Sequence, residues 1–138
     1  MKRPLLAAAA AFIAWILVAS VLNLVLRATL NGYAAAEPQM HFTPVMLLAR
    51  LAIAVLASLS AGAVIGWIAP LSLRTSWVFG AILLALFVPE HLRLWQRFPV
   101  WYHLTFLVTL VPLVMLGTLM ARAHRSATQL GVRPGASA

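Results

Sequence analysis

The chain has 138 residues, of which 64% are hydrophobic, and it contains no cysteine. Soluble domains have about 45–50% apolar residues, and the longest stretch between apolar segments here is about 16 residues, which leaves no room for a soluble domain. The lack of cysteine excludes disulfides, thiolate metal sites and cysteine nucleophiles, and the net charge of +8 comes from basic residues at the ends of apolar segments, which indicates contact with anionic lipid headgroups and no nucleic-acid partner.

Four apolar segments dominate the chain, and each is long enough to cross a lipid bilayer. A helix needs about 20 apolar residues to cross a hydrocarbon core of about 30 Å. The pattern predicts an all-α integral membrane protein, a four-transmembrane-helix antiparallel bundle in one domain over residues 1–125. Residues 126–138 are rich in small and turn-forming residues, so we expect a flexible cytoplasmic tail. The four segments span residues 4–26, 43–69, 73–92 and 100–121.

The first segment also has features of a secretory signal peptide. Lys2 and Arg3 precede an apolar run that reaches the small residues Ala19 and Ser20, where a signal peptidase could cleave. The apolar run continues to Leu26 without a polar cleavage region, which favours an uncleaved transmembrane helix. The sequence leaves cleavage open.

The distribution of basic residues predicts the orientation in the membrane. Cytoplasmic loops of membrane proteins carry more Lys and Arg than the opposite side. With both termini in the cytoplasm, six basic residues lie inside and three outside, so we predict this orientation. Nine of the ten basic residues are Arg, and Ala and Leu are abundant, which favours the inner membrane of a bacterium with a GC-rich genome. The inner set is Lys2, Arg3, Arg74, Arg122, Arg125 and Arg133, and the outer set is Arg27, Arg93 and Arg97.

A layer of polar residues is predicted in the outer half of the membrane. Measured from the cytoplasmic anchors at 1.5 Å per residue, Ser20, Arg50, Glu90 and Thr105 all lie about 25 Å up, and Asn23 and His103 lie slightly higher. A lone charge at the depth of Arg50 costs several kcal/mol, so we expect it to face a partner. The candidate intramembrane polar cluster is Asn23, Arg50, Glu90, His103 and Thr105.

The partner of Arg50 decides how this cluster is interpreted. Glu90 is the only acid at the depth of Arg50, so the expected contact is an Arg50–Glu90 ion pair, with Glu37 as the second choice. The pair is interpreted either as a structural contact between two helices or as part of a polar cavity that binds a small anion or polar ligand. Snorkelling of Arg50 to the headgroups is the third alternative.

Small residues recur every four positions below Arg50 on the second segment. Such a stripe lets a neighbouring helix approach closely, so we predict a packing surface whose partner helix the sequence leaves open. Two prolines also have structural consequences: Pro112 is expected to kink the fourth helix, and the residues between Pro89 and Pro99 have the spacing of a short interfacial helix. The stripe consists of Ala54, Ser58, Gly62 and Gly66.

No catalytic, metal or cofactor site is predicted. His41, His91 and His103 reach the outer side with the two acids, but no pair has the i, i+4 spacing of two ligands on one helix face. With two acids in the chain, an enzyme is not expected. The favoured hypothesis is a non-catalytic structural or accessory subunit whose partners are the lipid bilayer and either another membrane protein or a second copy. The alternative is a small homo-oligomeric transporter or channel with an outward-facing site around Arg50 and Glu90.

Overall fold

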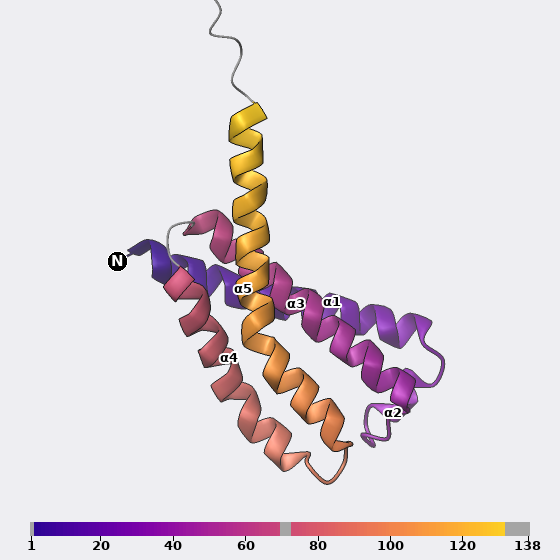
Figure 1. Cartoon of the computed structure of the whole chain (residues 1–138). Coiled ribbons are helices and arrows are strands. Elements are labelled where there is room, and N and C mark those ends of the chain that lie inside the picture. The colour runs from indigo at the N-terminus through magenta and orange to yellow at the C-terminus, as the bar shows by residue number, and fades with distance from the viewer. Residues whose placement is uncertain (1, 70–72, 132–138) are drawn as a thin grey trace, which may run out of the picture.

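The computed structural model describes residues 2–69 and 73–131, in which all regular secondary structure is helical. Four of the helices, α1, α3, α4 and α5, are long and apolar enough to cross a membrane. The prediction of an all-helical chain with four membrane-spanning helices is thus confirmed at the level of helix type, number and length. The helices are α1 (Lys2–Thr29), α2 (Tyr33–Ala36), α3 (Pro44–Ile68), α4 (Leu73–Arg93) and α5 (Val100–Gly131) (Figure 1).

Local chemistry accounts for several helix ends. The Thr43 side chain accepts a hydrogen bond from the Met46 amide at 3.4 Å, and Pro44 occupies the first turn of α3, where its missing N–H costs nothing. Helix α5 continues ten residues past the predicted end at Ala121 because residues 122–130 are helix-compatible and contain no proline. Residues 126–131, at the start of the predicted tail, are helical, and residues 132–138 lie outside the described residues.

The connection between α4 and α5 also differs from the prediction. No separate interfacial helix forms there, because α4 runs through Pro89 to Arg93. A tight turn follows, with hydrogen bonds from the Trp95 amide to the Leu92 carbonyl at 3.3 Å and from the Arg97 amide to the Leu94 carbonyl at 2.9 Å. The polar and aromatic residues of this stretch are consequently split between a helix end and a turn.

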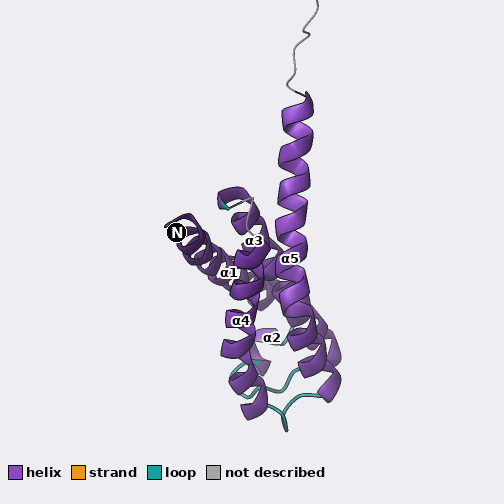
Figure 2. Ribbon diagram, turned by 60° about the vertical axis from the view of Figure 1, so that its left-hand side comes forward, coloured by secondary structure: helices purple, strands orange, loops and turns teal. Residues whose placement is uncertain are grey.

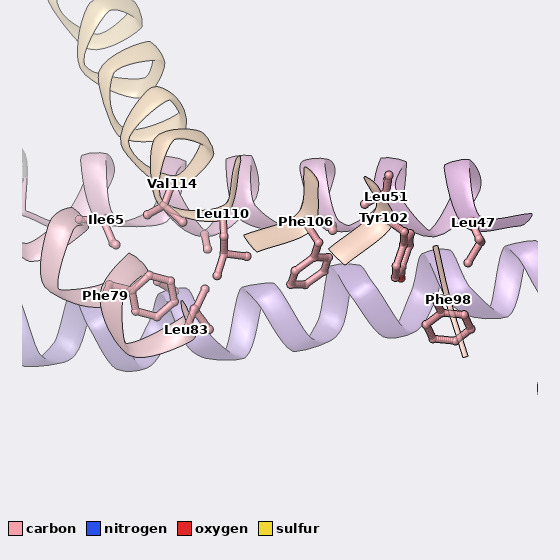
Figure 3. Close-up of a cluster of buried hydrophobic side chains, with 13 residues drawn as sticks. Leu47, Leu51, Ile65, Phe79, Leu83, Phe98, Tyr102, Phe106, Leu110 and Val114 are labelled. Atoms are coloured by element: carbon pink, nitrogen blue, oxygen red, sulfur yellow. The ribbon is translucent and has the colours of Figure 1, made fainter. Parts of the chain in front are cut away.

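Helix α3 is the centre of the packing. It lies between α1 and α5, and α4 packs mainly on α5, while α1 and α4 touch only slightly (Figures 1 and 2). The buried core brings together side chains of α3, α4 and α5 (Figure 3). It includes Leu47, Leu51, Ile65, Phe79, Leu83, Tyr102, Phe106, Leu110 and Val114.

Glycines bring α3 and α5 into backbone contact toward the C-terminal end of α3. A methyl group on Gly62 would collide with the Val114 carbonyl oxygen, and one on Gly66 would lie 2.7 Å from the Thr118 carbonyl oxygen. A methyl group on Gly117 of α5 would in the same way collide with the Leu59 carbonyl oxygen of α3. The sequence left open which helix packs on the small-residue stripe. At Gly62 and Gly66 that helix is α5.

Polar groups tie the same region together. The Thr118 hydroxyl donates to the Gly62 carbonyl at 2.9 Å and lies 2.8 Å from the Ser76 hydroxyl. Thr118 and Ser76 are both fully buried. One hydroxyl pair thus connects three helices, α3, α4 and α5, and within a bilayer such buried hydrogen bonds are costly to leave unmade.

Candidate functional site: a polar cavity at Arg50

The site begins with the turn after α1. Gly32 has a φ of 77°, a left-handed conformation that glycine adopts at little cost, and it reverses the chain into the short helix α2. This reversal directs Tyr33 into the protein, where its side chain is fully buried. Tyr33, from the connection between α1 and α3, therefore reaches the space between the long helices near Arg50.

A chain of hydrogen bonds runs from Arg50 to Glu37. Arg50 Nη1 donates to the Tyr33 hydroxyl at 3.0 Å, and this hydroxyl donates to Asn23 Oδ1 at 2.8 Å. Asn23 Nδ2 donates to Glu37 Oε1 at 2.9 Å, and Arg27 pairs with the other carboxylate oxygen at 2.9 Å. Every group in the chain donates toward the carboxylate, so the bonds polarise one another in one direction.

The protonation of Tyr33 keeps this chain intact. Burial raises the pKa of the Tyr33 phenol above its ordinary value and outweighs the nearby Arg50 cation, which lowers it. The hydroxyl therefore stays protonated at neutral pH. It can accept from Arg50 and donate to Asn23 at the same time.

Among the described residues, Arg50 has aromatic and phenolic neighbours and no carboxylate partner. Its guanidinium lies 4.7 Å from the centre of the Phe42 ring and donates to the Tyr33 hydroxyl at 3.0 Å, and Tyr102 lines the same cavity. The chain has only two acids, and both pair with other cations: Glu37 with Arg27 at 2.9 Å, and Glu90 with Arg93 at 3.2 Å. Arg50 Nε is buried and has no hydrogen-bond partner among the described residues.

A cavity of about 330 Å³ lies against Arg50, between α1, α3, α4 and α5. One part of its wall is polar and the other is aromatic or aliphatic. The polar part consists of Ser20, Asn23, Glu37, Arg50 and Tyr102. The apolar part consists of Trp15, Ala19, Ile53, Ala54, Phe87 and Phe106.

The structure brings Asn23 and Arg50 of the predicted polar cluster into one network, and it places the other three elsewhere. The expected Arg50–Glu90 ion pair does not form, because Glu90 is exposed and pairs with Arg93 of its own helix. Thr105 is also exposed. Equal height on two helices does not bring two side chains together when they point in different directions around the helix axes.

His103, the fifth predicted residue, belongs to a separate pair. Its Nδ1 lies 2.8 Å from Nδ1 of His91, so one ring donates and the other accepts. The His103 side chain is fully buried and stacks on Trp95, with ring centroids 4.9 Å apart. Its Nε2 has no hydrogen-bond partner among the described residues. This pair joins α4 to α5 beside the cavity wall without lining the cavity.

Several residues of the site were missed in the sequence. Tyr33 gave no signal because it lies between two apolar segments, and Trp15 gave none because it is an aromatic residue within an apolar segment. Tyr102 lies near the start of the fourth apolar segment and also gave no signal, yet it is only 5% exposed. The available signal was the lone Arg50, since a buried cation without an acid needs phenols and aromatic rings nearby.

Comparison of the chain with protein-family models, with curated proteins and with solved structures finds no match. The site is therefore interpreted from its own chemistry. A guanidinium that lines a cavity, and that has no carboxylate partner among the described residues, can bind an anionic group.

Proposed function

We propose that this chain is a small, non-catalytic, multi-pass membrane protein that binds an anion in an outward-facing cavity at Arg50. The observation that carries the proposal is that Arg50 lines a cavity of about 330 Å³ while both acids of the chain pair with other arginines. Arg27 and Glu37 cancel each other, so the cluster keeps one positive charge in excess. At membrane depth such a charge is costly, and an anionic ligand would neutralise it.

We also propose that the chain lies in the inner membrane of a bacterium, as an antiparallel four-helix bundle with both termini in the cytoplasm. The excess of basic residues at one end supports this orientation. Contacts support alternating helix directions: the first turns of α1 and α4 share a groove lined by Pro4 and Arg74, and Arg125 of α5 donates to the Trp67 carbonyl near the end of α3 at 2.7 Å. The cavity would then open to the outer side.

Orientation can be tested directly because the chain has no cysteine. Gln39→Cys and Ser126→Cys place single thiols at exposed positions near opposite ends. A membrane-impermeant maleimide should label Gln39→Cys on intact cells and Ser126→Cys only after lysis. The reverse pattern would place the cavity on the cytoplasmic side.

Anion binding is tested by thermal unfolding of the purified protein with chloride, nitrate or formate. Ligands that bind the folded state raise the unfolding temperature in a saturable way. We expect this rise in the wild type and its loss in Arg50→Gln. Glu90→Gln is the matched control, because it neutralises a charge predicted at the same depth but located outside the cavity. Equal stabilisation of Arg50→Gln and the wild type would contradict the proposal.

Transport by a homo-oligomer is one extension of this function, and an accessory role is the second candidate. The accessory role is supported by α1, since only 11% of its most apolar stretch is buried within the chain. Large apolar side chains such as Leu5, Ile13 and Leu24 are more than half exposed there, available to lipid or to another membrane protein. Co-purification of a stoichiometric partner that is lost when these residues become alanine would favour the accessory role.

A further inference from the structure

We propose that the Arg50 cavity takes a monovalent organic anion with an apolar body, in the class of small aromatic or aliphatic carboxylates. This inference names the ligand class and rests on the anion-binding function proposed above. Three features of the cavity support it: the number of free charges, the aromatic part of the wall and the size.

The site has one positive charge in excess, which matches a ligand with one negative charge. Among the described residues, Arg50 is the one cation that lines the cavity, and the lining acid Glu37 is already paired with Arg27. A dianion such as a phosphate ester would leave one charge without a partner in a region of low dielectric constant. A carboxylate fits better because its planar oxygens match the donor geometry of a guanidinium.

The aromatic wall matches an apolar body. Trp15 and Phe87 have ring centroids 5.1 Å apart, and Phe87 and Phe106 are also 5.1 Å apart, so three rings form a continuous row across α1, α4 and α5. The Trp15 indole is oriented by its hydrogen bond to the Ser58 hydroxyl at 3.3 Å. A bare inorganic ion would leave this row in contact with water, whereas an apolar body would cover it.

The size and the two-sided wall favour a small ligand. A volume of about 330 Å³ is close to the lower limit of ligand pockets, roughly 300 Å³. The head would contact Arg50 and Asn23, and the body would lie on the row formed by Trp15, Phe87 and Phe106. The exposed Ser20 lies at the rim, so the cavity is reached from the surface. The same chemistry is found in water-soluble carboxylates and in fatty acids of the bilayer.

Calorimetric titration of the full chain in lipid nanodiscs tests the inference with three probes. Benzoate has both the charge and the ring, formate has only the charge, and benzyl alcohol has only the ring. Because covering an aromatic ring removes a large apolar area from water, benzoate should bind at least about tenfold more tightly than formate. It should exceed benzyl alcohol by a similar factor, since the alcohol cannot neutralise Arg50.

Variants separate the two parts of the ligand. Arg50→Gln should abolish benzoate binding, and Glu90→Gln should leave it unchanged. Phe87→Leu should weaken benzoate several-fold and leave formate unchanged, whereas the matched Phe12→Leu, at a side chain 40% exposed on α1 and away from the cavity, should change neither. If Arg50→Gln does not fold, the comparison of benzoate with benzyl alcohol in the wild type decides the point.

The outcomes distinguish this inference from the function on which it rests. Equal affinities for formate and benzoate, both lost in Arg50→Gln, would overturn the carboxylate class and leave anion binding intact. No Arg50-dependent binding of any anion would overturn both. Competition by palmitate supplied in the nanodisc would support the class with the bilayer as source, and competition by octanoate alone would support it with the aqueous phase as source.

Discussion

The two halves of α3 have opposite properties. In the C-terminal half, Gly62 and Gly66 meet the backbone of α5 with no space for a methyl group. In the N-terminal half, Arg50 borders a cavity of about 330 Å³. One helix thus packs tightly against its neighbour at one end and leaves a ligand-sized space at the other.

This difference suggests a division of roles between the two ends of α3. Between helices in lipid the hydrophobic effect contributes little, so close packing and hydrogen bonds must hold the helices together. The glycine contact and the Thr118–Ser76 pair provide both at the C-terminal end of α3. We therefore expect substitutions at the glycine contact to reduce stability, and substitutions of residues that line the cavity to reduce mainly the proposed anion binding.

The largest effect on stability is expected for Gly62→Ala. The added methyl collides with the Val114 carbonyl oxygen, so α3 and α5 must separate. We expect a loss of about 3 kcal/mol, the upper end for overpacking, measured as thermal and chemical unfolding in detergent. Ala52→Leu is the control, because it adds more volume to the exposed side of α3 and should be nearly neutral. If both variants are equally stable, α5 does not pack on the glycines.

Tyr33→Phe is expected to have the next largest effect. It removes the hydroxyl that accepts from Arg50 and donates to Asn23, and it leaves the guanidinium without that contact. Hydrogen bonds to charged groups contribute about 1.5–3 kcal/mol, so we expect a loss of about 2 kcal/mol. In an Arg50→Met background the same substitution should cost less, and a double-mutant cycle measures the difference. Additive effects would show that the two residues are not coupled.

Stability should also depend on pH through Tyr33. Its pKa is raised in the folded state because burial disfavours the phenolate. Stability from this group is full below the ordinary tyrosine pKa of about 10 and falls as the pH rises from there through the folded value. Above pH 10, the free energy of unfolding of the wild type should therefore fall more steeply with pH than that of Tyr33→Phe, as measured by chemical unfolding at several pH values.

Thr118→Val should cost about 1 kcal/mol, within the range for hydrogen bonds between membrane helices. The substitution keeps the shape and removes the hydroxyl that reaches the Gly62 carbonyl and Ser76. Thr109→Val is a matched control on the same helix, since the Thr109 hydroxyl donates at 2.7 Å only within α5, to the Thr105 carbonyl. Equal losses in the two variants would mean that the contacts across helices contribute nothing.

The sequence predicted how high each polar residue lies along its helix better than the direction in which its side chain points around the helix axis. Arg50 and Asn23 were placed in one layer from the rise of 1.5 Å per residue, and they do share a network. Glu90 was placed at the same height, but it points to the surface while the next residue, His91, is buried, because one residue turns the helix by about 100°. The stripe including Gly62 and Gly66 could be assigned to one face because a spacing of four itself encodes direction.

Loop contributions could not be predicted in the same way. Tyr33 enters the site through the left-handed turn at Gly32 and the short helix α2. Neither feature has a periodic pattern in the sequence, and the Asn31–Gly32 pair indicates only that a turn occurs. The length of the apolar run that identified α3 also gave no information on which aromatic rings of other helices surround Arg50.

The smallest effect on stability is expected for Arg27→Gln, and it also tests the charge balance of the cavity. Arg27 is about half exposed, so its ion pair with Glu37 should contribute no more than about 0.5 kcal/mol and less at high salt. Without Arg27, however, Glu37 keeps its negative charge at the cavity wall and balances Arg50. We therefore expect a several-fold loss of anion affinity in titrations, with nearly unchanged thermal unfolding. Arg93→Gln frees Glu90 instead, outside the cavity, and should leave the affinity at the wild-type value. If both arginine variants bind as the wild type does, the excess charge at Arg50 does not set the affinity, and the stabilisation of an anion must come from neutral donors around the cavity.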